Sequence, residues 1–186
     1  MKSRVILAAA LLLAAARPLN AQQVSVATNA VDYLNLGALN GEVAVSLGRH
    51  LSLAAGAVYN PWSYGSEEKG YLQNRQRNFS LGMRYWPWHT YSGWWVALKG
   101  QYREYNRGGL FGNQKSEEGD AWGSGLAIGY ALMLSRHLNL DFGLGAWAGT
   151  TAYTTYACPR CGRILERGNK VFLQPDEMRA AIVYLF

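Results

Sequence analysis

The chain has 186 residues, of which 49% are hydrophobic, 13% aromatic and 16% charged, with 21 glycines and only 5 prolines. This composition excludes a disordered chain and is typical of one β-rich domain. Without residues 1–21, the formal net charge falls from +6 to +3, with 15 Lys and Arg remaining against 12 Asp and Glu. Because no concentrated basic face is visible, nucleic acid is not an expected partner.

The first 21 residues have the pattern of a secretory signal peptide. Lys2 and Arg4 precede the apolar run of residues 5–16, and Ala21 ends an acceptable small-residue cleavage site. The run is too short to cross a bilayer, and no later segment approaches about eighteen uninterrupted apolar residues. We therefore predict a signal peptide over residues 1–21 and no membrane-spanning helix.

The rest of the chain alternates between apolar residues and small or polar ones, with the period of two that a pleated strand imposes. The predicted strands cover residues 24–30, 39–48, 51–60, 78–87, 92–105, 120–134, 138–150 and 176–186. The hairpin of residues 120–150 is the clearest, with Ser135-Arg136-His137 as its turn. Its strands exceed the roughly five or six residues usual in soluble sheets.

The predicted connections alternate between turns of a few residues and longer loops, the longest of which cover residues 61–77, 106–119 and 151–175. Outer-membrane barrels have this asymmetry, with short periplasmic turns and long extracellular loops. A sheet in lipid must also close, because unpaired backbone groups at an edge have no water to bind. We therefore predict an all-β, eight-stranded antiparallel up-and-down transmembrane β-barrel over residues 22–186.

The face opposite the apolar one carries charges of both signs in mid-strand. We expect these residues to form an interior charge network: Glu42, Arg84, Lys99, Arg103, Asp141 and Arg179. Side chains nearly fill an eight-stranded barrel, so a filled interior is expected, with strand glycines leaving room for Trp95 and Trp147.

A soluble barrel of the lipocalin type, with its apolar face inward, is the alternative. Aromatic residues near the strand ends favour lipid outside; they are Tyr59, Tyr85, Trp94, Tyr184 and Phe186.

The chain also resembles known families. The terminal Ile182-Val183-Tyr184-Leu185-Phe186 resembles the C-terminal signal by which small bacterial outer-membrane barrels are recognised for insertion. Four further motifs together resemble an uncharacterised family of small outer-membrane barrels, a domain of unknown function common in Bacteroidetes: Ala27-Thr28-Asn29, Tyr59-Asn60-Pro61-Trp62, Arg84-Tyr85-Trp86 and Cys158-Pro159-Arg160-Cys161-Gly162. The resemblance covers nearly the whole chain after the signal, implies an outer-membrane location and lends no activity.

The pair Cys158 and Cys161 is the sharpest local motif. A CxxC turn is half of a four-cysteine zinc knuckle, but the chain has no second CxxC. In an exported loop we favour a disulfide. Zinc shared with a partner, or held with help from Glu166 or Asp176, is an alternative metal site, and free or redox-active thiols are another. No other cofactor is expected.

Catalytic residues are not expected. His50, His89 and His137 all fall in the predicted short turns, so no Ser/His/acid constellation can be assembled at the long loops. Basic residues gather in the last predicted loop; they are Arg160, Arg163, Arg167 and Lys170. They could bind lipopolysaccharide phosphate or an acidic surface partner. We favour the interpretation that they are solvated loop charges.

These patterns predict a non-enzymatic integral protein of the cell outer membrane, with a filled interior and a structural or anchoring role through its extracellular loops. A small-solute channel or ligand-binding barrel is the alternative, and an outer-membrane enzyme ranks last. The expected partners are outer-membrane lipid, lipopolysaccharide and an envelope or surface-assembly protein.

Overall fold

The computed structural model describes residues 24–66, 70–109, 115–158 and 162–186, so the predicted signal peptide lies outside the described residues. The elements follow one another as β1 (Val24–Asn29), α2 (Ala30–Leu34), β2 (Leu39–Ser46), β3 (Leu51–Asn60), β4 (Ser63–Ser66), β5 (Gly70–Tyr85), β6 (Gly93–Gly108), β7 (Ser116–Met133), β8 (Leu138–Tyr156) and β9 (Ile164–Leu185). No helix in this part of the chain is long and apolar enough to cross a membrane.

The strands form one closed antiparallel barrel. Their order is β3-β2-β1-β9-β8-β7-β6-β5-β4, and pairing of β3 with β5 closes the ring. The short β4 also pairs with β5 and continues the line of β3 beyond Pro61 and Trp62. The nine strand segments therefore make the predicted eight-stranded antiparallel barrel, and the fold prediction is confirmed.

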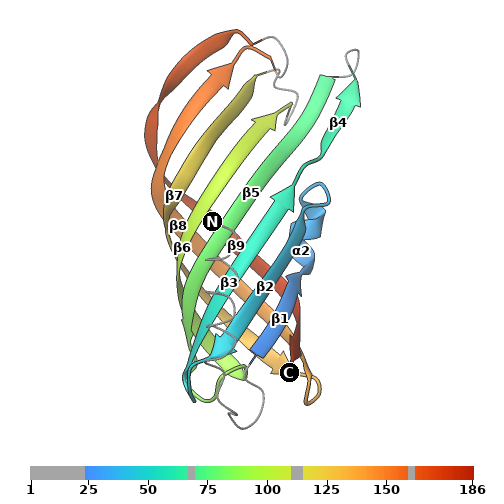
Figure 1. Cartoon of the computed structure of the whole chain (residues 1–186), viewed down its shortest axis with the longest axis vertical. Coiled ribbons are helices and arrows are strands. Elements are labelled where there is room, and N and C mark those ends of the chain that lie inside the picture. The colour runs from blue at the N-terminus through green and yellow to red at the C-terminus, as the bar shows by residue number, and fades with distance from the viewer. Residues whose placement is uncertain (1–23, 67–69, 110–114, 159–161) are drawn as a thin grey trace, which may run out of the picture.

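The two ends of the barrel differ (Figure 1). The tight connections β2–β3, β5–β6 and β7–β8 gather with the C-terminus at one end, here called the turn end. At the other, extended end, β5 to β9 continue far beyond β1 and β2. Strand β1 pairs with β9 only along the segment from Ala181 to Leu185, so the remainder of β9 pairs with β8 alone.

The prediction of three long loops at this end is wrong in extent. Strand pairing continues through much of residues 61–77, 106–119 and 151–175, for example between Glu117 and Thr155. The backbone ladder needs no apolar face. Polar residues stand on both faces of most of these strands, and β9 has apolar residues on both faces, Val171 and Leu173 on one and Phe172 on the other, so the period of two disappears from the sequence while the hydrogen bonds persist. We call this part the extension: β4 with residues 70–77, 104–108, 116–120, 152–156 and 164–176.

The connection between the first two predicted strands, residues 24–30 and 39–48, also contains structure. The helix α2 begins after Asn29, whose side-chain oxygen accepts a hydrogen bond from the Val31 amide at 3.3 Å, as an N-cap residue does. The same Asn29 donates to the Met178 carbonyl at 3.1 Å and accepts from the Ala180 amide at 2.9 Å. Asn29 therefore ties the start of α2 to the edge of β9.

The apolar face of the barrel wall points outward. Leu98, Leu126 and Leu144 are 59–63% exposed, whereas their chain neighbours Ala97 and Ala127 are 5–6% exposed and face the interior. All five predicted strand-end aromatics are also outward and at least 45% exposed. The arrangement of a soluble barrel with an apolar interior is therefore not the one adopted.

Two tryptophans are buried inside the barrel at the turn end. Trp86 and Trp95 are 1% and 0% exposed, with ring centroids 6.4 Å apart, and Trp86 meets Tyr91 edge-on at 5.8 Å. The indole nitrogen of Trp86 donates to the Ser52 hydroxyl at 3.0 Å, which satisfies its buried polar group. Gly129 and Gly143 lie directly against the Trp95 ring, as the sequence predicts, whereas none of the described glycines has an atom of the Trp147 ring among its nearest contacts.

Gly129→Ala is expected to lower the free energy of unfolding by about 1–3 kcal/mol, because overpacking forces the neighbours to shift. Its Cβ would lie 2.2 Å from the Phe142 carbonyl oxygen and 2.3 Å from Cζ2 of Trp95. Gly41→Ala is the matched control, since its Cβ would meet nothing within 4 Å. Urea unfolding in detergent micelles measures both variants. Equal loss in the two would contradict the close packing of Trp95 on Gly129.

Candidate functional site

The first group of interior charges, the turn-side cluster, consists of Glu42, Arg84, Asp141 and Arg179. Glu42 accepts hydrogen bonds from Arg84 at 2.7 Å and from the two terminal nitrogens of Arg179 at 2.9 and 3.2 Å. Asp141 accepts from Arg179 Nε at 2.7 Å and from Trp95 Nε1 at 2.6 Å. The side chains of Asp141, Arg179 and Arg84 are only 3–8% exposed, so each buried charge has an opposite charge beside it.

The second group, the outer cluster, is centred on Asp176 and includes Lys99, Gln101 and Arg103. Lys99 Nζ lies 2.7 Å from one carboxylate oxygen of Asp176. Arg103 and Gln101 donate to the other oxygen, Gln101 at 3.1 Å. The Asp176 side chain is 3% exposed, so three donors replace the water it would bind outside.

Each cluster includes an arginine stacked on an indole. The guanidinium carbon of Arg84 lies 4.9 Å from the Trp95 ring centroid, and that of Arg103 lies 4.9 Å from the Trp147 ring. Trp147 is 1% exposed and packs on Phe172 at 4.4 Å. Cation–π contact of this kind adds to the ion pairs of each cluster.

The six charges singled out in the sequence all lie inside the barrel, but in two clusters. Asp176 was missed as an interior group because it has the parity of the outward residues Met178 and Ile182. The register of β8 and β9 shifts between Leu144 and Ala146, beside Pro175, and this irregularity turns Asp176 inward. Pro175, directly before the predicted strand of residues 176–186, is the signal that could have indicated it.

A cavity of about 220 Å³, here called the chamber, lies within the barrel and touches both clusters. Glu42, Arg84 and Arg179 line it on the turn side. Lys99, Gln101, Arg103 and Arg107 line it from β6, and Asn78 from β5. Asp32 and Asn35 contribute from α2 and the residue after it. The loop at Asn35 is held in place by Asn74, whose amide donates to Asn35 Oδ1 at 2.6 Å.

Next to the chamber, a row of inward residues continues along β6 into the extension. The hydroxyl of Tyr105 donates to Glu117 at 2.9 Å, and burial raises the pKa of Tyr105 to about 12, so it remains protonated. Lys170 contacts both carboxylate oxygens of Glu117 at 2.9 Å. Burial and the nearby charge of Arg103 lower the pKa of Arg107. Sequence reasoning missed Arg107 because the predicted strand ended at Tyr105.

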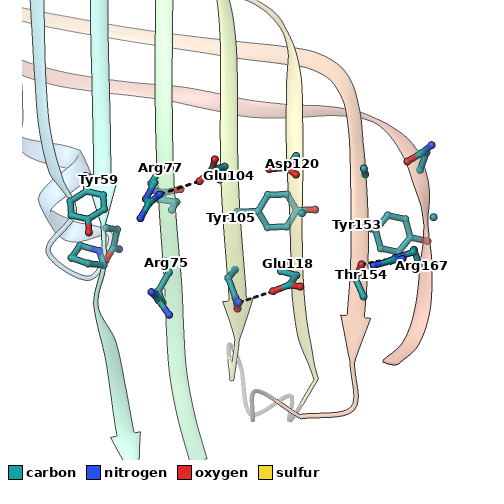
Figure 2. Close-up of a pocket in the computed structure, with 18 residues that line it drawn as sticks. Tyr59, Arg75, Arg77, Glu104, Tyr105, Glu118, Asp120, Tyr153, Thr154 and Arg167 are labelled. Carbon is teal, nitrogen blue, oxygen red and sulfur yellow. Dashed lines mark hydrogen bonds and ion pairs between the residues drawn. The ribbon is translucent and has the colours of Figure 1, made fainter. Parts of the chain in front are cut away.

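The outward face of the extension has a hollow of about 870 Å³, which Figure 2 shows across β3 and β5 to β9. Arg77 and Glu104 form an exposed ion pair at 3.7 Å on its wall. Asn106 donates to Glu118 at 3.2 Å, and Arg167 Nε to the Thr154 hydroxyl at 3.4 Å. The labelled charges are balanced in sign: Arg75, Arg77 and Arg167 against Glu104, Glu118 and Asp120. We call this surface the outer hollow.

The basic residues predicted to share the last loop do not form one patch. Arg160 lies outside the described residues, and Arg163 is exposed. Arg167 faces the outer hollow, whereas Lys170 points into the barrel toward Glu117. A strand separates neighbouring side chains onto opposite faces, which a loop does not.

The remaining chemical candidates lie apart from these cavities. Cys158 is disulfide-bonded, whereas Cys161 lies outside the described residues. The ring nitrogens Nδ1 of His50 and His137 lie 2.9 Å from the carbonyls of Trp86 and Leu185 at the turn end. Within the described ranges, no three His, Cys, Asp or Glu side chains are grouped so that they could hold a metal ion.

These features define the class of protein: a closed eight-stranded antiparallel β-barrel with an apolar outer wall and a charged interior. The chain matches over residues 6–186 the family described as protein of unknown function (DUF3575), and it belongs to that family. No curated protein sequence matches it.

Proposed function

We propose that this protein is a non-enzymatic, integral barrel of the outer membrane whose filled interior prevents ion flow and whose extension anchors envelope or surface components. The observation that carries the proposal is the opposite polarity of the two faces of the wall. Outward apolar residues are broadly exposed, while the inward charges are buried in ion pairs. Only an apolar surrounding makes that exposure favourable.

The outward face has the dimensions that a membrane requires. On β6 its apolar side chains run from Trp94 to Tyr102 before Glu104 begins. This matches the roughly 9–11 residues of a tilted membrane-crossing strand. Tyr102 and Trp122, at the border with the charged outer hollow, suit the headgroup level, where aromatic belts lie. The extension would then project from the membrane.

The filled interior is supported by the turn-side cluster together with Trp86 and Trp95. These side chains meet across the lumen from β2, β5, β6, β8 and β9, and the two indoles are at most 1% exposed. A permeating ion would have to displace close-packed rings and separate buried ion pairs, and both changes cost free energy. The chamber is then a blind cup on the outer side of this layer.

The proposed anchoring role of the extension rests on the accessible surface of the outer hollow. The outer hollow displays arginines and carboxylates at the level where lipid headgroups or a partner protein would lie. Lipopolysaccharide phosphates suit Arg75, Arg77 and Arg167, and a protein partner suits the mixed charges. None of the described residues that line it is a serine, histidine or cysteine, and we propose binding rather than catalysis.

Reconstitution into liposomes tests the proposal directly. The folded protein is expected to float with the vesicles and to leave ion flux at the level of empty liposomes. Flux is measured with a potassium-gradient dye assay, with an open porin as the positive control. Protein that stays in the aqueous fraction would contradict the membrane location, and steady flux with inserted protein would contradict the filled interior. The second outcome would favour the small-solute channel.

A further inference from the structure

The chamber contains polar atoms that the protein itself leaves without hydrogen bonds. Among the described residues, buried atoms without a partner include Nε of Arg103, Nε of Arg107, Oδ1 of Asn78 and Oε1 of Gln101. All four residues line the chamber. Asn78 is the direct cross-strand neighbour of Arg103, so donors and acceptors occur side by side. Unpaired buried polar atoms are costly, which indicates that something polar occupies this space.

The charges around these atoms favour an anion. The described side chains lining the chamber include five cations (Arg84, Lys99, Arg103, Arg107 and Arg179) and three carboxylates (Asp32, Glu42 and Asp176). Within the described part of the chain, Arg107 has no carboxylate within ion-pair distance, and its guanidinium lies 5.1 Å from the Tyr105 ring. Burial, and after it the nearby charge of Arg103, lower the pKa of Arg107, although the more distant charge of Glu117 opposes the shift.

The volume of the chamber and its unpaired amide oxygens limit the class of ligand that it can bind. A volume of about 220 Å³ lies below the roughly 300–1,000 Å³ of pockets that hold drug-sized ligands, so the occupant is small. A carboxylate or phosphate group satisfies the two arginines but leaves the amide oxygens of Asn78 and Gln101 without donors. Hydroxyl groups on the same ligand would supply them.

We propose that the chamber binds a small hydroxylated anion, such as a sugar acid, with its acidic group between Arg103 and Arg107 and its hydroxyls on Asn78 and Gln101. This ligand site goes beyond the anchoring role, because it uses the inner face of the wall and not the outer hollow. It does not require an open pore, since the ligand would enter and leave by the same side.

Isothermal titration calorimetry of the folded full-length protein in detergent micelles tests the proposal, with D-glucuronate as the probe and neutral methyl glucoside beside it. Binding of D-glucuronate alone is expected. Arg107→Gln should weaken it about tenfold to hundredfold, the usual effect of losing a charged hydrogen bond. Arg49→Gln is the matched control, because Arg49 carries the same charge, is exposed, and lines neither the chamber nor the outer hollow.

Two further comparisons separate binding from folding. Arg107→Lys retains the charge without the planar guanidinium group, so it should bind D-glucuronate more weakly than the wild type but more tightly than Arg107→Gln. If the glutamine variant proves unstable, the weaker binding of Arg107→Lys tests the site without it. Unchanged urea midpoints confirm that the variants fold. Equal heats for the neutral sugar would overturn the proposal, as would equal affinity in Arg107→Gln and Arg49→Gln. No binding at millimolar concentration would also overturn it and would indicate a chamber that holds only water.

Discussion

Trp95→Ala is expected to lower the free energy of unfolding by about 3–5 kcal/mol, the range found when a buried aromatic side chain is truncated to alanine. Trp95 has no exposed surface, and its ring lies against Gly129 and Gly143 and beneath Arg84. Strand pairing holds these neighbours in place, so they cannot collapse into the space that the indole leaves. Urea unfolding in micelles, followed by far-ultraviolet circular dichroism, measures the loss without relying on tryptophan fluorescence.

A second substitution at the same position divides this effect. Trp95→Phe retains most of the ring but removes the hydrogen bond to Asp141, which is 2.6 Å long. Hydrogen bonds to charged groups contribute about 1.5–3 kcal/mol, so Trp95→Phe should lose roughly half as much free energy of unfolding as Trp95→Ala. If both variants lose the same amount, the hydrogen bond and not the packing of the ring determines the effect.

Trp94→Ala is the matched control on the same strand. Trp94 points outward, is 52% exposed, and meets the Tyr130 ring edge-on at 5.3 Å. Removing it leaves no enclosed cavity, and the expected loss is that of one aromatic pair, about 0.5–1.5 kcal/mol. Losses of equal size at positions 94 and 95 would contradict the assignment of the two faces.

The sequence predicts the barrel wall well because one face is apolar along most strands. Leu126, Ile128 and Tyr130 alternate with Ala127 and Gly129, and this pattern specifies both the strand and its two faces. The number of strands and the tight turns follow from the same alternation. The direction in which each face points required the three-dimensional structure, because alternation is equally compatible with an apolar interior.

The extension could not be predicted in this way. Polar residues such as Glu117, Glu118 and Asp120 stand on both faces of β7 there. This part of the strand is specified by pairing with neighbours that are distant in the chain. Local composition therefore resembles a loop while long-range hydrogen bonds form a ladder. Arg107 was lost from the candidate site for this reason, although it continues the inward row of Lys99, Gln101 and Arg103.

The division of the interior charges into two clusters also depends on register. Pairing between β5 and β6 places Arg84 opposite Ala97, near the turn end, and Asn78 opposite Arg103, six residues further along β5. At about 3.3 Å per residue, this separation keeps Arg84 and Arg103 from sharing one carboxylate. The sequence identifies which charges lie inside but not which of them meet, since cross-barrel contacts depend on the stagger of every strand.

Glu42→Gln is expected to lower the free energy of unfolding by about 3–5 kcal/mol, because it removes one partner of a buried ion pair and leaves the other charges uncompensated. Glu42 is bonded to both Arg84 and Arg179, whose side chains are 8% and 6% exposed. Asp141 remains, but it lies 3.9 Å from Arg84 and cannot replace a contact of 2.7 Å. Glu104→Gln, which loses only the exposed 3.7 Å pair with Arg77, should cost about 0–1 kcal/mol.

A double-mutant cycle shows whether the stability that Glu42→Gln loses comes from the uncompensated arginine charge. Arg84→Gln combined with Glu42→Gln removes a cation and an anion together, so the double variant should be more stable than the sum of the two single losses predicts, with a coupling of about 1–3 kcal/mol. Additive losses would mean that Glu42 acts by filling space and not by compensating charge. Coupling also bears on the proposed barrier to ions, because an interior whose charges are interdependent resists the partial rearrangement that a permeating ion would need.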